Sequence, residues 1–161
     1  MIKLLSRLFA RAEPMLSEAS ARDAAPIAAL HGASFRRGWS EEEVESLLID
    51  RHVITHRATA AGKLTGFIMS RRVEDEAEIL SVAVAPARRG KGFSRILLNH
   101  HLRRLAGLGN RAVFLEVGKD NAPALSLYRR SGFKEVGQRP GYYQHEKKGP
   151  VTALVLRRDL T

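Results

Sequence analysis

Hydrophobic residues recur with two different spacings along this chain. Short apolar or alternating runs predict strands, over residues 15–20, 52–60, 64–73, 77–85, 111–117, from 133 onward and 151–158. Apolar positions three and four residues apart predict helices, over residues 23–34, from 40 onward, 96–107 and 121–132. We therefore expect an α/β protein of the mixed α+β kind, with a central sheet of about six or seven strands flanked by about four helices.

Polar residues at the predicted helix starts are of the types that cap free backbone N–H groups. Asp23 is the candidate N-cap of the first helix, and Ser40 with Glu43 has the spacing of a capping box for the second. Asn121 precedes the last predicted helix, and Pro123 falls in its first turn. These residues predict where three of the helices begin.

The stretch from Leu80 to Ser94 joins an apolar strand to an amphipathic helix, through Pro86 and the run RRGKGFS. A strand–turn–helix of this kind presents backbone N–H groups and the positive end of a helix to an anion, with basic side chains alongside. We therefore expect it to hold a phosphorylated cofactor. A solvated basic turn before an ordinary helix is the alternative.

The glycine spacing excludes one type of phosphate loop and leaves another open. A Walker A loop needs glycine, four residues and then Gly-Lys-Ser/Thr, an order that does not occur in this sequence. A dinucleotide fingerprint needs a third glycine at position 95, where this chain has Arg95. It also needs an acidic residue about twenty positions further on, and Glu116 lies at roughly that distance. On these residues alone, a dinucleotide-binding sheet stays an alternative.

Composition limits the number of domains and the chemistry. The chain has 161 residues, of which 44% are hydrophobic, which suits one well-buried core better than two. It contains no cysteine, so disulfides, zinc–thiolate sites and a cysteine nucleophile are excluded. Any acyl transfer is therefore direct or uses another nucleophile. We expect a cytoplasmic protein.

The charge is strongly basic, at 27 Lys and Arg against 17 Asp and Glu, a formal net charge of +10. Such a chain favours polyanionic partners, among them phosphorylated cofactors, RNA and acidic protein. The basic residues are scattered and aromatic residues make up only 6%, so direct nucleic-acid binding is weakly supported. The histidines show no metal-ligand spacing, since the adjacent His100 and His101 face different directions on a helix, and no metal is expected.

The first residues differ in character from the rest. Residues 1–13 predict a short basic, amphipathic N-terminal extension, followed by a single domain over 14–161. A signal peptide needs a longer apolar core, and no stretch reaches transmembrane length. We expect no membrane partner.

Two motifs carry a resemblance to a known family. Arg89-x-x-Gly92-x-Ser94 resembles the pyrophosphate-binding signature of the GNAT N-acetyltransferases, with serine where glycine or alanine is usual. Leu115-Glu116-Val117, followed by Asn121-x-x-Ala124-x-x-Leu127-Tyr128-x-x-x-Gly132-Phe133, resembles the distal signature of the same superfamily. The resemblance covers about residues 14–158 and implies the GNAT fold, with acetyl-CoA as the cofactor.

The resemblance also implies which residues contact the cofactor. Backbone groups near Val84 and along the basic turn are expected to bind the thioester carbonyl and the pyrophosphate, and Asn121 the pantetheine arm. The expected cofactor-binding set is Val82, Val84, Arg89, Gly90, Lys91, Gly92, Phe93, Ser94, Asn121 and Tyr128.

Two residues are implied in catalysis. An amine attacks a thioester only as the free base, and Glu116, a carboxylate in the apolar run FLEV, matches the glutamate assigned as that base. Tyr128 matches the tyrosine placed at the thioester sulfur as general acid. The alternatives are an outward-facing strand carboxylate paired with an arginine, and a core tyrosine packed under the last strands.

Further residues resemble one branch of the family, the bacterial enzymes that acetylate the N-terminal alanine of a ribosomal protein. These are Gly38-Trp39-Ser40 and Arg139-Pro140-Gly141-Tyr142-Tyr143. The resemblance implies that Trp39, Tyr142 and Tyr143 surround an incoming protein or peptide N-terminus. Two alternatives stay open: acetylation of a small amine such as a polyamine or aminoglycoside, and a non-catalytic module that senses acetyl-CoA or binds RNA or the ribosome.

Overall fold

A computed structural model describes residues 14–145 and 149–160, with the backbone alone for 143–145. Within these residues, seven strands form one sheet in the order β1-β2-β3-β4-β5-β7-β6. The strands are β1 (Met15–Glu18), β2 (Val53–Ala60), β3 (Lys63–Val73), β4 (Glu76–Val84), β5 (Ala112–Gly118), β6 (Lys134–His145) and β7 (Gly149–Asp159). The predicted N-terminal extension, 1–13, lies outside the described residues.

Four α-helices and two short 3₁₀ turns accompany the sheet in the described part of the chain. They are η1 (Ala21–Asp23), α2 (Ala24–Ser34), α3 (Glu41–Ile49), η2 (Pro86–Arg88), α4 (Phe93–Gly107) and α5 (Ala122–Arg130). The predicted element order and the mixed α/β class are confirmed, with boundaries that move by a few residues.

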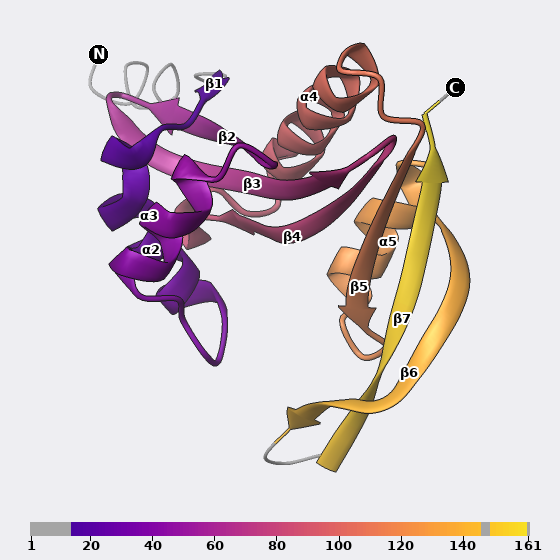
Figure 1. Cartoon of the computed structure of the whole chain (residues 1–161). Helices are drawn as coiled ribbons and strands as arrows, with labels where there is room; N and C mark the ends of the chain where they lie inside the picture. The colour runs from indigo at the N-terminus through magenta and orange to yellow at the C-terminus, as the bar shows by residue number, and fades with distance from the viewer. Residues whose placement is uncertain (1–13, 146–148, 161) are drawn as a thin grey trace, which may run out of the picture.

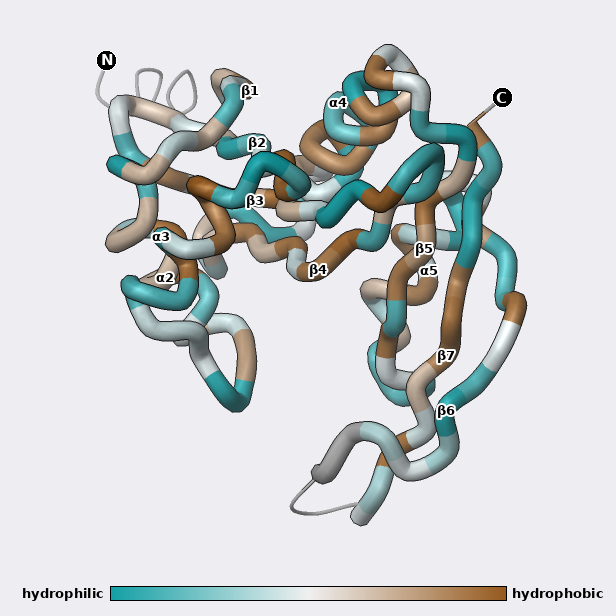
Figure 2. The backbone as a smooth tube through the Cα atoms, viewed as in Figure 1, coloured by the Kyte–Doolittle hydropathy of each residue, from teal (hydrophilic) through white to brown (hydrophobic). Residues whose placement is uncertain are grey.

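The helices cover the sheet from both sides (Figure 1). On one side α2 and α3 contribute Ile27 and Val44 to a core that includes Phe67 of β3. On the other side α4 and α5 bury a larger set of apolar side chains with the central strands, among them Leu98 and Leu156. Strands β4, β5 and β7 contain many hydrophobic residues, whereas the outer strand β6 is mostly hydrophilic (Figure 2).

Strands β4 and β5 are paired for only part of their length. They are the parallel pair of the sheet, and their register runs from Glu76 opposite Ala112 to Glu78 opposite Phe114. Beyond that point β4 stays paired with β3, and β5 with β7. The two halves of the sheet therefore diverge, as Figure 1 shows, and the edge of β4 on the β5 side is left without a strand partner beyond Glu78.

All three predicted N-cap residues stand at the N-cap of their helices, and two of them cap with their side chains. Ser40 Oγ accepts the N–H of Glu43 at 3.1 Å, and the Glu43 carboxylate accepts the N–H of Ser40 at 2.7 Å. Asn121 Oδ1 accepts the N–H of Ala124. Asp23 is the N-cap residue of α2, but its side chain makes no cap bond to that helix. That carboxylate is buried and pairs with Arg57 of β2 at 2.6 Å.

Candidate active site

A cleft of about 1050 Å³ opens where β4 and β5 diverge. Side chains reach it from α2 and the loop that follows, from β4, β5 and α5, and from the bend in β6. Six of the residues predicted for the site line it: Trp39, Val82, Glu116, Asn121, Tyr128 and Tyr142. Residues that come from positions about a hundred apart in the sequence therefore meet in one hollow.

Glu116 stands in the middle of β5, on the face that the α4–α5 core does not cover. Its neighbours Leu115 and Val117 are buried in that core, because side chains alternate along a strand. The Glu116 side chain is 18% exposed, and its Oε1 lies 3.0 Å from Nε of Arg139. The carboxylate is thus both a strand residue paired with an arginine and a group at the wall of the cleft.

Tyr128 and Asn121 reach the cleft from α5. The Tyr128 ring packs edge-on against Phe133, with ring centroids 5.6 Å apart, and only 8% of the residue is exposed. Asn121 caps the helix and lines the cleft at the same time. Tyr128 therefore packs in the core and lines the cleft at the same time.

The basic turn follows β4 directly and leads into α4. Helix α4 begins after Gly92 without a side-chain cap, and its first turn is closed by the bond from the Ile96 N–H to the Gly92 carbonyl. Gly90 and Gly92 have φ of +73° and +81°, a conformation that favours glycine. A Cβ at Gly92 would meet no protein atom within 4 Å, so the space beside the turn is open. These features fit a pyrophosphate, which binds to uncapped N–H groups at a helix start.

The cofactor-binding residues predicted from Val84 to Ser94 do not line the cleft. Some of them stabilise the turn itself. Nε of Arg89 donates to the Val84 carbonyl at 3.0 Å, across the end of β4. Val84 and Phe93 are buried, and the guanidinium of Arg88 lies 5.9 Å from the Phe93 ring centroid. Lys91 is exposed and Ser94 is half-buried. The turn therefore lies past the cleft, where β4 ends.

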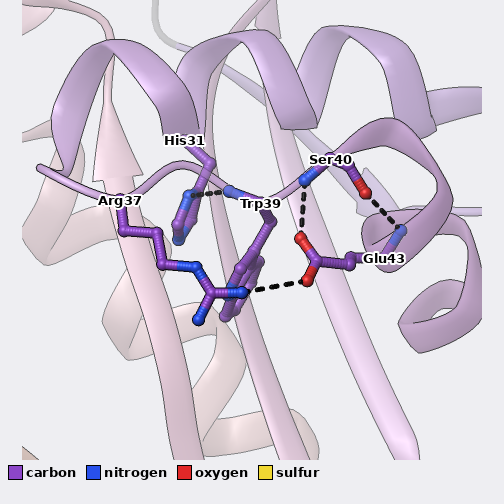
Figure 3. A network of polar contacts seen from close by, with 5 residues as sticks. All are labelled: His31, Arg37, Trp39, Ser40 and Glu43. Atoms are coloured by element: carbon purple, nitrogen blue, oxygen red, sulfur yellow. Dashed lines mark hydrogen bonds and ion pairs between the residues drawn. The ribbon is translucent and has the colours of Figure 1, made fainter.

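The loop between α2 and α3 is fixed by a residue that the sequence did not single out for the site. The buried imidazole of His31 stacks on the indole of Trp39, with centroids 4.0 Å apart, and its Nδ1 accepts the Trp39 N–H at 3.0 Å (Figure 3). Burial lowers the pKa of His31 below its usual 6.5, with an opposing effect of Glu43. The ring is therefore held as a neutral acceptor. Its only sequence signal was its helical spacing.

The same loop carries an ion pair at its surface. Arg37 lies 3.4 Å from Glu43, the residue that also closes the capping box of α3 (Figure 3). Arg37 lines the cleft, as do Phe35 and Arg36, none of which the sequence singled out. These three residues line the cleft because of the way the loop folds back, and no local sequence motif predicts that fold.

The β6–β7 hairpin covers the cleft from the opposite side. Its register is irregular between Arg139 and Tyr143, which face Ala153 and Val151, so that residues 140–142 form a bulge. Tyr142 in this bulge is 52% exposed and lines the cleft. Tyr143 is paired with Val151, and its side chain lies outside the described residues.

Comparison with known proteins decides the family. The sequence pattern of the acetyltransferase (GNAT) family matches residues 24–133. The chain belongs to the GNAT family. It is therefore an acetyl-CoA-dependent N-acetyltransferase, and the resemblance found in its two motifs is confirmed.

Several GNAT proteins are similar over most of their length. The [ribosomal protein bS18]-alanine N-acetyltransferase of Escherichia coli K12 is 35% identical over 105 residues, 65% of this chain and 70% of that protein. The N-alpha-acetyltransferase RimI of Mycobacterium tuberculosis is 37% identical over 106 residues, 63% of each. The crystal structure of the Escherichia coli ribosomal-protein-S18-alanine N-acetyltransferase superposes with a TM-score of 0.86 at 27% identity, covering 92% of this chain and 94% of that one.

Within residues 14–145 and 149–160, no helix has the length and apolar character needed to cross a membrane.

Proposed function

We propose that this GNAT enzyme acetylates the N-terminal α-amine of a protein. Its Escherichia coli relative is named for this reaction on an alanine of ribosomal protein bS18, and its Mycobacterium tuberculosis relative is named an N-alpha-acetyltransferase. The observation that carries the proposal is the shared cleft of Glu116, Tyr128, Trp39 and Tyr142. Two groups suited to proton transfer lie in it beside two aromatic side chains, one from the loop between α2 and α3 and one from the bulge in β6. That arrangement suits the extended end of a peptide better than a small molecule, which would need a closed pocket.

The proton transfers follow from the chemistry of the amine. An α-amino group with a pKa near 8 is mostly protonated at neutral pH, so a base must remove a proton before or during attack. In the proposal Glu116 takes that proton, directly or through water. Acetyl-CoA supplies the thioester whose carbonyl carbon the amine attacks. As the carbon–sulfur bond breaks, Tyr128 donates its hydroxyl proton to the leaving sulfur, and the tyrosinate regains a proton from the nitrogen as the amide forms. Because the chain has no cysteine, transfer is direct rather than through an enzyme thioester.

The residues that hold the cofactor are proposed from their places in the fold. The N–H of Arg89 donates to the Pro86 carbonyl, so the N–H groups from Gly90 to Ser94 are those that bind the pyrophosphate at the start of α4, beside the exposed Lys91. The backbone of Val82 and Val84, at the diverging end of β4, faces the pantetheine and the thioester carbonyl. Asn121 contacts the pantetheine from the other wall. Arg89 acts through the turn, which its side chain holds against β4.

A small cationic amine is the second candidate, because the cleft carries carboxylates as well as arginines. The cleft is lined by the carboxylates of Glu78, Glu116 and Asp120, together with Arg36 and Arg37. The cleft is therefore less basic than the net charge of +10 indicates, and Glu78 and Asp120 are the carboxylates that a polyamine would meet beside the Arg139–Glu116 pair. A module that only senses acetyl-CoA is not favoured, since it requires neither Glu116 nor Tyr128 at the cleft.

The acceptor is tested by mass spectrometry after incubation with acetyl-CoA. Three acceptors are compared: a peptide with the N-terminal sequence of ribosomal protein bS18, the same peptide with a blocked N-terminus and a free lysine, and a polyamine. Acetylation of the first peptide alone, at its α-amine, supports the proposal. Acetylation of the polyamine alone supports the second candidate and contradicts the first.

A further inference from the structure

The ion pair between Arg139 and Glu116 joins two strands that are not neighbours in the sheet. Strand β7 lies between β5 and β6, with Glu116 opposite Val155 and Arg139 opposite Ala153. Nε of Arg139 nevertheless lies 3.0 Å from Oε1 of Glu116. The arginine therefore reaches diagonally across β7, from the hairpin to the carboxylate in the cleft.

The register of the sheet explains how the arginine can reach that far. The residue opposite Val155 on β6 is Gly137, which has no side chain to stand between the hairpin and Glu116. Arg139 is two residues further along β6 and so shares the face of Gly137. A Cβ at Gly137 would meet only Val155, at 3.7 Å, so this path over β7 is open.

Arg139 has a second contact, on the side of the acceptor. Its guanidinium carbon lies 5.3 Å from the ring centroid of Tyr142, within the range of a cation–π interaction. Tyr142 belongs to the bulge that follows Arg139 and lines the cleft. One side chain thus contacts both the carboxylate and the aromatic residue that we propose for catalysis and for acceptor binding.

We propose that Arg139 is a positioning residue, which fixes the Glu116 carboxylate through Oε1 and holds Tyr142 at the rim. In this arrangement the second oxygen, Oε2, takes the proton of the acceptor amine. The proposal rests on the proposed function, in which Glu116 is the base. A guanidinium suits the task because it donates in a fixed plane and also stacks on an aromatic ring, whereas the ammonium of lysine is a single compact charge.

The test is a double-mutant cycle of Arg139→Gln and Glu116→Gln, with turnover of the bS18 N-terminal peptide and acetyl-CoA affinity measured for each variant. If Arg139 acts through Glu116, Arg139→Gln lowers kcat by up to about 100-fold, the loss that a misplacement near 1 Å can produce. The double variant is then no slower than Glu116→Gln alone, since the two residues work as one unit. Acetyl-CoA affinity stays at the wild-type value in all three.

Matched variants separate positioning from charge and from folding. Arg157→Gln removes a cation from β7 that pairs with Asp159 at 2.9 Å and lies outside the cleft, and it should keep wild-type kcat. Arg139→Lys keeps the charge and should recover only part of the lost rate. Wild-type kcat in Arg139→Gln, or losses that multiply in the double variant, would overturn the role of Arg139. Full activity of Glu116→Gln would instead overturn the proposed base, and with it this role.

Discussion

Trp39 contacts the imidazole of His31 twice: its indole stacks on the ring, and its backbone N–H donates to Nδ1 at 3.0 Å. The proposed acceptor wall is thus fixed by a buried side chain of the preceding helix. His31→Phe keeps an aromatic ring but leaves the Trp39 N–H unpaired, at a cost of about 1–3 kcal/mol in unfolding free energy. His31→Ala also loses the ring contact. We expect KM for the peptide to rise from wild type to Phe to Ala, while acetyl-CoA affinity stays constant.

Calorimetry and steady-state kinetics on the two His31 variants check this order. Equal KM values in wild type and His31→Ala would show that Trp39 does not contribute to acceptor binding, or that it is held by other contacts.

Gly92 should be needed for cofactor binding more than for folding. With φ at +81°, an alanine there is strained by about 1–2 kcal/mol, and a glutamate adds a negative charge where the pyrophosphate is expected. We predict that Gly92→Glu abolishes acetyl-CoA binding by calorimetry. Gly109 is the matched control, because it has φ of +93°, equally open surroundings, and lies beyond the other end of α4. Gly109→Glu should lower Tm similarly and leave the affinity intact.

Tyr128→Phe separates the two roles of the tyrosine, ring packing in the core and proton donation by the hydroxyl. The variant keeps the ring that packs against Phe133, so the fold should lose no more than about 1 kcal/mol for the hydroxyl. If the hydroxyl donates the proton to the leaving sulfur, kcat falls by at least about 100-fold, the usual contribution of a general acid. A variant with lowered Tm and unchanged kcat would leave Tyr128 as a core residue only.

A buried pair of histidines should make stability depend on pH. Nδ1 of His56 and Nδ1 of His101 are 2.7 Å apart, and the second ring nitrogen of His101 lies 2.7 Å from Oγ of Ser70. Burial, followed by neighbouring positive charges, lowers the pKa of His56 to about 4 and that of His101 to about 3. Both are therefore neutral in the folded state at pH 5, whereas an unfolded histidine titrates near 6.5.

The direction of this pH dependence follows from proton uptake by the unfolded chain. As the pH falls below 6.5, the unfolded chain binds protons that the folded chain excludes, so stability decreases until the folded pKa values are reached. Each histidine contributes a slope of up to about 1.4 kcal/mol per pH unit. Denaturant unfolding at pH 8, 6.5 and 5 checks this, since most carboxylates titrate below that window. Equal unfolding free energies at 6.5 and 5 would contradict it.

Two serines provide a matched comparison for this network. Ser70→Ala leaves the buried His101 nitrogen without its partner and should cost about 1–3 kcal/mol. Ser81 is also buried, but its hydroxyl has no hydrogen-bond partner among the described residues. Ser81→Ala should therefore be neutral or stabilising. Equal losses in the two variants would show that the hydrogen bond of Ser70 contributes nothing.

Local patterns in the sequence predicted most of the fold. The capping box of Ser40 and Glu43 involves residues three apart, so its signal is complete within one helical turn. Asp23 also had a cap-like position, yet its carboxylate pairs with Arg57, 34 residues away on β2. Its second oxygen accepts the N–H of Ser20, which caps η1 rather than α2, and no sequence pattern records the partner on β2.

The candidate site was predictable only in part, for the same reason. Glu116, Tyr128 and the glycines of the turn belong to contiguous motifs, whose resemblance carried the prediction. His31 and Arg139 act through partners that the fold brings to them, across a loop and across β7. The cleft itself depends on β4 and β5 separating after Glu78 and Phe114, a feature of strand pairing rather than of either strand.

The most direct test of the account is the single-turnover rate of Glu116→Gln with acetyl-CoA already bound and the bS18 N-terminal peptide in excess. This measurement isolates the acetyl-transfer step from binding and product release. We predict a rate at least about 100-fold below wild type at neutral pH, the loss expected for a missing general base, with unchanged acetyl-CoA affinity. A wild-type rate would show that Glu116 removes no proton from the acceptor and would contradict the proposed mechanism.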